Sequence, residues 1–458
     1  MTPRSLSLPG AALALILSTP VAAQTATALA EARTEALSDT VALDFVEDLT
    51  TEVGARQGGT EAEARAREWA VARLNAMGFA NVRSEAFTMP TWVRGEEQAS
   101  IVSPYPHTLA ITTLGNSAAT PAGGMSGEVV GFRSLAEFEA APDSAIRGKI
   151  VYIGHAMRPT QDGSSYGAFG PVRFSGPDRA ARRGAAAIVI RSVGTDSHRN
   201  PHTGNTNFGD GVRPIPAGAI SNPDADNLER ILDRAPGVVR MRLLLTPRNI
   251  GPQQSGNVIA EIPGSDPSAG IVVAACHLDS WDLGTGAIDD GAGCAIIAAA
   301  AKRVEAMGQP RRTIRLLMAG AEEVGIWGGK AYGVAHAGDN HAAALESDFG
   351  AGRIWRVDFR LPGAGATVAD RIAAALSPIG IARGRGEAGG GADVGALAAV
   401  GVPLVDLQQD GTDYFDLHHT PDDTFDKIVP ADLAQNVAVW TVTLALLANA
   451  PEELGAAQ

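Results

Sequence analysis

Cysteine is scarce in this chain, with only 2 among 458 residues. A small disulfide-rich scaffold is therefore excluded. Basic residues are also in deficit, because 37 Lys and Arg stand against 51 Asp and Glu and leave a formal net charge of −14. Broad electrostatic binding of nucleic acid or of an anionic membrane is not expected from such a chain. A small molecule is therefore favoured as the partner. The 45% of hydrophobic residues exclude a wholly disordered protein, and 458 residues are enough for two or three domains, each with its own core.

Long hydrophobic runs are equally rare, and the one that stands out lies at the N-terminus. Arg4 precedes an apolar stretch over 6–17, and the small residues Val21-Ala22-Ala23 follow. This order predicts a signal peptide over residues 1–23, cleaved near Ala23. An uncleaved membrane anchor is the alternative, but the run is shorter than the roughly 20 residues that a span needs. No later run is expected to span a membrane, so we predict an exported protein, periplasmic or secreted, without membrane association after cleavage.

The two cysteines, Cys276 and Cys294, both lie in the second half of the chain. Export would place them in an oxidising compartment, where they could pair. Because one is expected at the end of a strand and the other early in a helix, we interpret them as buried small apolar residues.

Hydrophobic patterning divides the mature chain into three parts. Residues 24–102 contain an amphipathic helix expected over 60–77, with a capping box at its start and Gly78 at its end. Residues 103–248 alternate short β-like runs with Gly-, Pro- and Asn-rich loops, as in a separate, mostly β module. Residues 249–458 alternate apolar strands with helices, which indicates a sheet covered on both faces. We therefore predict one α/β domain built from both ends of the chain and interrupted by an inserted module.

Acidic residues and histidines gather where the C-terminal strands are expected to end, which is where open α/β sheets place their ligand sites. One strand runs into His277 and Asp279, and Asp289 and Asp290 follow at the start of the next helix. His277 can ligate a metal while Asp279 accepts its second ring N–H. A carboxylate at the helix start can bridge two cations, although N-capping accounts for one of the two.

Three further groups of the same kind follow. Glu322 and Glu323 come after the next strand, Glu346 and Asp348 after another, and a late loop carries the residues 418–423. Adjacent buried carboxylates are costly unless one binds a metal and the other handles a proton. Two histidines and three carboxylates form a ligand set for two divalent ions, and nitrogen and oxygen donors without a thiolate favour zinc.

This inventory predicts amide hydrolysis by water. Two cations about 3.5–4 Å apart lower the pKa of a shared water and polarise the scissile carbonyl. A carboxylate that is not a ligand takes the proton and passes it to the leaving amine. A serine nucleophile is the competing mechanism, but the sequence has no Gly-x-Ser-x-Gly elbow at a strand-to-helix turn.

These motifs resemble the co-catalytic zinc exopeptidases, the clan of bacterial leucyl aminopeptidase and glutamate carboxypeptidase, and most of all its carboxypeptidase Q branch. The likeness spans nearly the whole mature chain and is most specific at four segments: 92–97, 201–204, 277–293 and 321–323. It implies a mixed sheet with helices on both faces, a protease-associated domain inserted at 103–248, and a catalytic domain completed by 249–458. It also implies two zinc ions per chain, short peptides as substrates, and a possible homodimer.

The resemblance assigns a role to each residue at the strand ends. His277 and Asp348 would hold one zinc, Glu323 and His419 the other, Asp289 would bridge them, Glu322 would be the general base, and Asp279 and Asp423 would orient this catalytic group. His419 is preferred to His418 because the family's ligand directly precedes a small hydroxyl residue. Asp289 is preferred to Asp290 because it stands four residues before a glycine, as in relatives.

We therefore expect an exported two-zinc exopeptidase that hydrolyses short peptides, most simply dipeptides with free termini. A metal-dependent deacylase of N-acyl amino acids is the first alternative, because it uses the same metals with a different pocket. A binding protein that uses the inserted module beside a vestigial site is the second, and glutaminyl cyclisation is a minor third.

Four other residues are interpreted as structural. His198 and His202 are expected to be loop histidines, the second with a structural hydrogen bond in its Pro-His-Thr-Gly turn. Asp393 is expected to cap the following helix, and Trp281 to pack beside the site.

Overall fold

The computed structural model describes residues 21–455, and an eight-stranded sheet forms its larger part. In spatial order the strands are β1 (Ala80–Val93), β10 (Arg248–Ile262), β12 (Thr313–Ala319), β11 (Ile271–His277), β13 (His341–Glu346), β16 (Leu404–Gln409), β14 (Ile354–Arg360) and β15 (Ala382–Arg383). The central strands β12, β11, β13 and β16 run parallel. The pairs β1–β10, β10–β12 and β14–β16 are antiparallel, and β15 pairs parallel with β14. The sheet is thus mixed, as predicted.

Helices cover both faces of this sheet, which confirms the predicted fold class. They are α1 (Val21–Ala36), α2 (Val41–Glu52), α3 (Glu61–Ala76), α10 (Ala292–Ala306), α11 (Trp327–Ala335), α12 (Gly365–Leu376), α13 (Gly395–Ala399), α14 (Tyr414–Leu417) and α15 (Pro430–Asn449). Successive residues of β11 point to opposite faces. Val272 packs into a cluster with α10 and α15, whereas Val273 joins Tyr332 of α11 and Leu397 of α13 on the other face.

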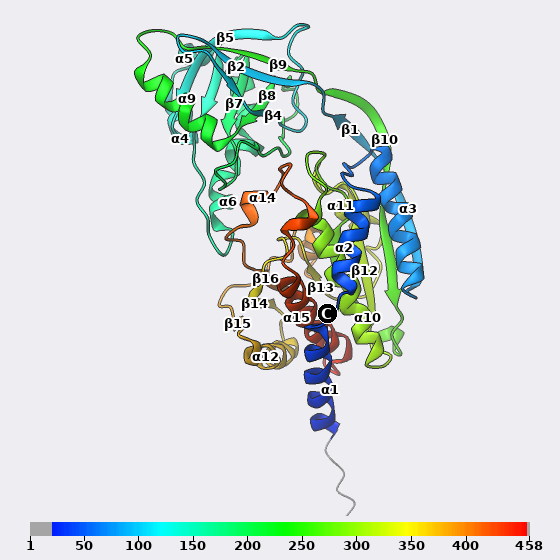
Figure 1. Cartoon of the computed structure of the whole chain (residues 1–458). Helices are drawn as coiled ribbons and strands as arrows, with labels where there is room; N and C mark the ends of the chain where they lie inside the picture. Colours follow the sequence, from blue (N-terminus) through cyan, green and yellow to red (C-terminus); the bar gives the residue numbers. More distant parts are fainter. Residues whose placement is uncertain (1–20, 456–458) are drawn as a thin grey trace, which may run out of the picture.

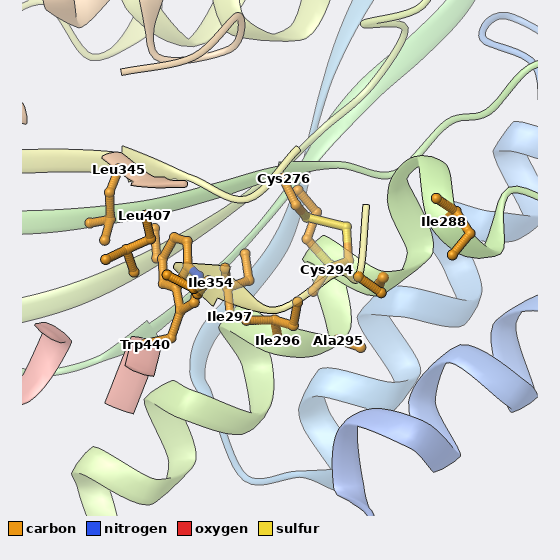
Figure 2. Close-up of a cluster of buried hydrophobic side chains, with 14 of the residues drawn as sticks. Cys276, Ile288, Cys294, Ala295, Ile296, Ile297, Leu345, Ile354, Leu407 and Trp440 are labelled. Atoms are coloured by element: carbon orange, nitrogen blue, oxygen red, sulfur yellow. A yellow bond between two sulfur atoms is a disulfide. The ribbon is translucent and has the colours of Figure 1, made fainter. Parts of the chain in front are cut away.

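A disulfide joins Cys276, near the end of β11, to Cys294, in the first turn of α10, with an S–S distance of 2.10 Å. The two cysteines are buried, as we interpreted them, but they are paired, which we had not assigned. Figure 2 shows the reason, because the first turn of α10 lies directly against the end of β11, so that the two sulfur atoms meet inside the buried cluster.

Helix α15 corrects a second expectation. With 20 residues and a mean hydropathy of 1.3 over its most apolar window, it is long and apolar enough to cross a membrane, contrary to our expectation for the later sequence. However, 83% of that window is buried inside the protein. It packs against α10, α1 and α12, so its apolar character belongs to the core. The predicted signal run over 6–17 lies outside the described residues, and the expected cleavage point near Ala23 falls in the first turn of α1.

A second eight-stranded sheet is formed by residues between 97 and 245. In spatial order its strands are β3 (His107–Leu109), β2 (Glu97–Ser103), β9 (Arg240–Leu245), β5 (Met125–Phe132), β6 (Ile150–Ile153), β7 (Ala187–Arg191), β8 (Ala217–Ile220) and β4 (Ile111–Thr113). Strands β5 to β8 are parallel, and parallel neighbours need crossover connections. This part accordingly contains more helix than its sequence indicated: α4 (Leu135–Ala140), α5 (Asp143–Ile146), α6 (Ser164–Phe169), α7 (Pro171–Phe174), α8 (Gly176–Arg182) and α9 (Asn222–Arg234).

The two sheets are connected by the paired strands β1 and β10, which run as a ribbon from one to the other (Figure 1). In the same view α6 of the second sheet reaches down to α14 of the first. Ring contacts confirm that they touch, since Tyr166 of α6 stacks on Phe415 of α14 at a centroid distance of 4.8 Å. A segment of the upper part is thereby held over the edge of the lower sheet.

Candidate metal centre

The predicted site residues meet at one edge of the larger sheet because the strands that precede them are parallel. β11 pairs with both β12 and β13 in parallel, and His277 lies opposite Ala319. The segments that leave these strands therefore emerge side by side. Glu322 and Glu323 follow β12, and Asp348 follows β13, so that all reach the same region as His277.

His277 faces two of the predicted ligands. Its Nε2 lies 3.1 Å from Oδ1 of Asp289 and 3.4 Å from Oδ1 of Asp348. Its Nδ1 lies 3.0 Å from the main-chain oxygen of Asp279, which can only accept a hydrogen bond. Nδ1 thus carries a hydrogen, and Nε2 is the nitrogen that remains for a cation held together with the two carboxylates.

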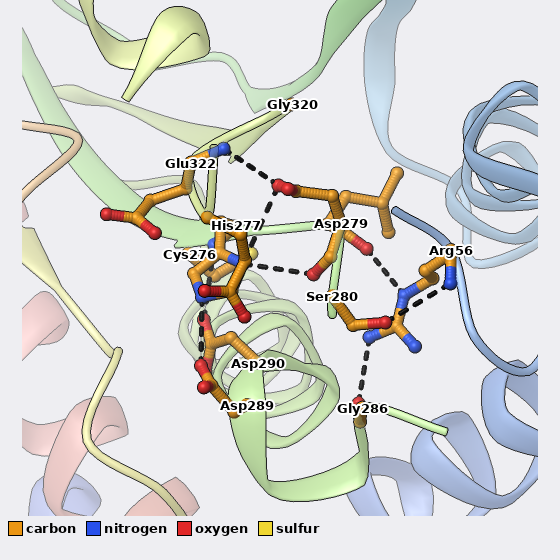
Figure 3. Close-up of polar contacts among 12 residues, drawn as sticks. Arg56, Cys276, His277, Asp279, Ser280, Gly286, Asp289, Asp290, Gly320 and Glu322 are labelled. Carbon is orange, nitrogen blue, oxygen red and sulfur yellow. Dashed lines mark hydrogen bonds and ion pairs between the residues drawn. The ribbon is translucent and has the colours of Figure 1, made fainter. Parts of the chain in front are cut away.

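Asp279 supports the site differently from our expectation. Its carboxylate is 3.7 Å from Nδ1 of His277, and the nearer acceptor is its own carbonyl. The carboxylate Oδ1 instead accepts the main-chain N–H of Glu322 at 2.9 Å. Figure 3 shows dashed lines from Asp279 to both His277 and Glu322, so that one residue orients both.

His419 and Glu323 approach Asp289 from the other side. Nε2 of His419 is 2.9 Å from Oε2 of Glu323 and 3.4 Å from Oδ2 of Asp289. His418 stacks on His419 at 3.5 Å between ring centroids, and its Nε2 is 3.8 Å from Asp289. Both histidines therefore reach the aspartate, but only His419 also contacts Glu323.

Asp289 and Asp290 are adjacent in sequence and differ in their contacts. Asp290 accepts the main-chain N–H groups of His277 and Gly293, each at 3.1 Å, so it ties the strand end to the first turn of α10. Oδ2 of Asp289 is buried and has no hydrogen-bond partner among the described residues. The capping function is thus filled by Asp290, and Asp289 is left to face the histidines.

Burial and crowding shift the pKa values of these carboxyl groups upward. Burial, with the nearby carboxylates of Asp348 and Asp279, raises the pKa of Glu322 to about 8. Burial also raises the pKa of Asp348, against the opposing effect of His277. Several buried carboxylates in one place are unfavourable unless positive charge neutralises them.

The donor set suits divalent cations. His277, Asp289 and Glu323 can offer ligand atoms within 4.8 Å of one another, as can Asp289, His418 and His419. A third group of this kind contains Asp290, but both of its oxygens already accept main-chain N–H groups. Asp289 Oδ2 and Glu323 Oε1 are buried without a hydrogen bond in the described chain, and a cation would satisfy both. Nitrogen and oxygen donors of this kind fit zinc.

Asp423 holds the backbone of Asp289. Its carboxylate accepts the N–H of Ile288 at 2.6 Å and that of Asp289 at 3.2 Å. Burial raises the pKa of Asp423 to about 7, with Asp289 adding to the effect. Asp423 thus lies one contact behind the candidate metal ligands, as the sequence analysis expected of an orienting residue.

Arg56 is a supporting residue that the sequence analysis missed. This fully buried side chain donates to the carbonyls of Leu278, Thr285 and Gly286 at 2.5, 2.6 and 2.8 Å (Figure 3). It thereby fixes the loop between His277 and Asp289. Its position in a short connection between two helices carries no local pattern that would have revealed this contact.

The Pro-His-Thr-Gly turn over 201–204 is hydrogen-bonded to the loop that carries His418 and His419. The buried ring of His202 donates from Nδ1 to the carbonyl of His418 at 2.6 Å, and Thr203 N–H donates to the carbonyl of His419 at 3.1 Å. His202 is therefore structural, as predicted. The exposed His198 contacts Asp422 at 2.9 Å, as fits a loop histidine.

A cavity of about 430 Å³ opens onto this site. Its floor contains the carboxylates of Asp289, Glu322, Glu323 and Asp348, whereas its roof comes from the second sheet. The roof residues are Tyr166, Arg173, Phe174, Asn205 and Asn207. None of them was proposed from the sequence.

Asp393, in the glycine-rich loop over 384–395, corrects our expectation that it caps the following helix. Asp393 does not cap α13 but accepts the N–H of Gly329 in α11 at 3.2 Å. Oε2 of Glu346 accepts the N–H groups of Asp393 and Val394 at 2.9 and 3.2 Å. This places the loop beside the cavity, where Ala392 contributes to the lining. Trp281 packs 5.8 Å from the ring of His419, beside the site as expected.

A mixed sheet whose parallel strands deliver histidines and carboxylates to one cavity defines a metallohydrolase. Comparison with known proteins gives the family. The sequence model of the family described as Peptidase family M28 matches residues 257–444 of this chain. Carboxypeptidase Q of Bos taurus is 34% identical over 89% of this chain and 85% of its own length, and that of Homo sapiens is 32% identical over the same shares.

Solved structures agree with this assignment. A Peptidase M28 precursor from Shewanella amazonensis has a TM-score of 0.91 and 44% identity, over 94% of this chain and 98% of its own. An aminopeptidase from Aneurinibacillus sp. strain AM-1 has a TM-score of 0.63 at 20% identity, over 94% and 98%, and shares the fold. The chain belongs to peptidase family M28, and it is a metallo-exopeptidase similar to carboxypeptidase Q.

Proposed function

We propose that this protein is a two-zinc exopeptidase that hydrolyses short peptides, in particular dipeptides with free termini. The proposal rests on a difference in contacts among the buried carboxylates. Asp289, Glu323 and Asp348 contact His277 or His419, whereas the carboxylate of Glu322 lines the cavity and makes no hydrogen bond or ion pair within 21–455. Glu322 is thus positioned to handle a proton rather than to hold a metal.

Each residue then has a defined task. His277 and Asp348 would hold one zinc and Glu323 and His419 the other, and Asp289, which contacts both histidines, would be shared by the two ions. Zinc supplies Lewis acidity, which polarises the scissile carbonyl and acidifies water. Glu322 accepts the proton of the attacking water and transfers it to the leaving amine. Asp279 keeps Glu322 in place through its main-chain N–H.

We keep the inserted protease-associated-like domain expected over 103–248 as a proposal. It is supported by the second sheet, whose strands start earlier, at Glu97 of β2, and end at Leu245 of β9. We assign activity to the periplasm or the exterior, because the N-terminal pattern of Arg4, an apolar run and small residues is that of a signal peptide.

The test is elemental analysis of the purified mature protein, followed by assays of free, N-acylated and C-amidated dipeptides. We expect about two zinc ions per chain, cleavage of the free dipeptide, and loss of cleavage after chelation that zinc restores. Cleavage of N-acylated substrates alone would establish the deacylase instead. Absence of both metal and cleavage after zinc addition would contradict the proposal and favour a binding protein.

A further inference from the structure

The disulfide closes the segment of chain that carries two of the proposed metal ligands. Cys276 directly precedes His277 in β11, and Cys294 follows Asp289 in the first turn of α10, 18 positions after its partner. Both cysteines belong to the buried cluster between the sheet and α10, and neither is exposed (Figure 2). The bond therefore joins the backbone beside one ligand to the helix that begins after the other.

Asp289 is not held by the regular structure of that helix. Helix α10 begins at Ala292, whereas the backbone of Asp289 is non-helical, with φ −131° and ψ 88°. The N–H of Asp289 donates to the carboxylate of Asp423, and its own carboxylate faces His277 at 3.1 Å. The contact between Asp289 and His277 crosses the junction of helix and strand, so it persists only while the helix start stays against the strand end.

Two connections span this junction, and only one of them is covalent. Asp290 accepts the main-chain N–H groups of His277 and Gly293, each at 3.1 Å. The disulfide lies beside this bridge, with Sγ of Cys294 3.2 Å from the main-chain oxygen of His277. The two Cα atoms of the disulfide are 5.2 Å apart, and an intact bond keeps such atoms within about 4.4–6.8 Å. Hydrogen bonds alone set no such limit on the separation of the two elements.

We propose that the disulfide positions His277 and Asp289 for zinc, so that the metal centre binds tightly only in the oxidised protein. A site of this kind works only while its ligands stay within about 0.5 Å of their productive positions. The inference rests on the two-zinc function proposed above and adds a positioning element that does not touch the metal. Reduction should weaken chiefly the ion of His277 and Asp348, because Glu323 and His419 lie outside the segment that the disulfide closes.

A water-soluble phosphine supplies the reduction for the test. The phosphorus attacks one sulfur atom and the S–S bond breaks. Water then gives its oxygen to phosphorus, which leaves as the phosphine oxide, and its two protons to the two sulfur atoms. The chain has only 2 cysteines, so no other disulfide can react. Because both are buried, attack requires α10 to move away from β11, and zinc held across the junction should oppose this movement.

The first measurement is the zinc affinity of the full-length mature protein, by competition with a chelator, before and after reduction and removal of the phosphine. We expect the reduced protein to lose affinity by about 10–100-fold at one of its two sites. Cys276→Ala/Cys294→Ala should show the same loss, although it has no thiol that could itself bind zinc. Val273→Ala removes buried carbon from the other face of β11, so it should lower thermal stability and leave both affinities unchanged.

The second measurement is the rate of reduction, followed by the mass of the protein after alkylation of its new thiols, and it needs no turnover. Zinc at about ten times its Kd should slow reduction of the parent about tenfold. His277→Ala should abolish this protection, whereas His419→Ala should keep most of it. A merely structural disulfide would give the same protection in both histidine variants.

The outcomes separate this inference from the proposed reaction. Equal zinc affinity of the oxidised and reduced proteins, or equal protection in the two histidine variants, would overturn the positioning role and leave the peptidase unaffected. If the parent cleaves no peptide while the difference in zinc affinity persists, the reaction is wrong and the positioning role stands. An oxidised parent that binds no zinc overturns both.

Discussion

The floor and the roof of the cavity are built on different principles. The floor consists of side chains that leave parallel strands at one sheet edge, and it is closely packed, acidic and tied to its own backbone by Asp279, Asp290 and Asp423. The roof comes from short helices of the second sheet and contributes aromatic rings, amides and the cation Arg173. The chemistry is thus concentrated in the floor, whereas the features that can discriminate among substrates lie in the roof.

The difference also shows in how each part is fixed. Residues of the floor are held both by contacts close in sequence, such as the hydrogen bond from His277 N–H to Asp290, and by contacts within the larger sheet's own part, such as that from Ile288 N–H to Asp423. The roof is held to the floor by contacts far apart in sequence, including Tyr166 on Phe415 and Thr203 on His419. Substitutions in the floor should therefore affect turnover and metal, and those in the roof should affect substrate choice.

The largest effect is expected from removing the free carboxylate of the floor. Glu322→Gln keeps the shape of the side chain but not its ability to accept a proton, so kcat should fall by about 10²–10⁴-fold. Zinc content and dipeptide affinity should remain those of the parent. Glu61→Gln, at an exposed position at the start of α3, is the control. Normal turnover in Glu322→Gln would show that another group takes the proton.

The next largest effect is expected on the local stability of the loop that Arg56 holds beneath the floor. Arg56→Met removes the donors to three buried carbonyls between 278 and 286, and unpaired buried groups of this kind destabilise by about 3–5 kcal/mol in total. Hydrogen–deuterium exchange over 278–290 should report this loss, while exchange in β5 to β8 stays unchanged. Arg230→Met, at an exposed position of α9, should change neither region. Equal loosening of both sheets would mean that floor and roof unfold as one unit.

The sequence was informative about the floor because its signals are local. The apolar runs over 271–276 and 313–318 of the sequence coincide with β11 and β12 to within one residue at the ends. The polar residues that follow each run marked the sheet edge. β14 (Ile354–Arg360) was missed because it alternates buried and partly exposed residues and contains three charges, so it lacks a continuous apolar run. The disulfide was missed because it depends on how closely α10 packs against β11.

The roof could not be predicted for a related physical reason. Arg173 lies in a helix of four residues and faces His419, which is 246 positions away in the sequence. No local periodicity encodes such a contact, and a single arginine among many carries no signal of burial. Arg56 was missed likewise, because its carbonyl partners lie more than 200 positions further along the chain.

The smallest effect is expected on zinc affinity, from substituting two neighbouring aspartates, one of which contacts the floor and the other the second sheet's part. Asp423 holds the backbone of Asp289, whereas Asp422 contacts His198 and Asn200 of the second sheet at 2.9 and 2.7 Å. Asp423→Asn weakens a contact one step behind a proposed metal ligand, so zinc affinity should fall by about 10–100-fold. Asp422→Asn makes the same chemical change one residue away and touches only the roof.

Competition of each variant with a zinc chelator measures this difference. Asp422→Asn should keep the zinc affinity of the parent, because its partners are loop residues far from the ligand atoms and its ion pair with His198 is largely exposed. Equal weakening in both variants would mean that the second sheet shapes the metal site through the loop 418–423. Unchanged affinity in both would show that Asp423 does not position Asp289. A loss of zinc affinity in Asp423→Asn alone would mean that the floor positions the metal ligands without help from the second sheet.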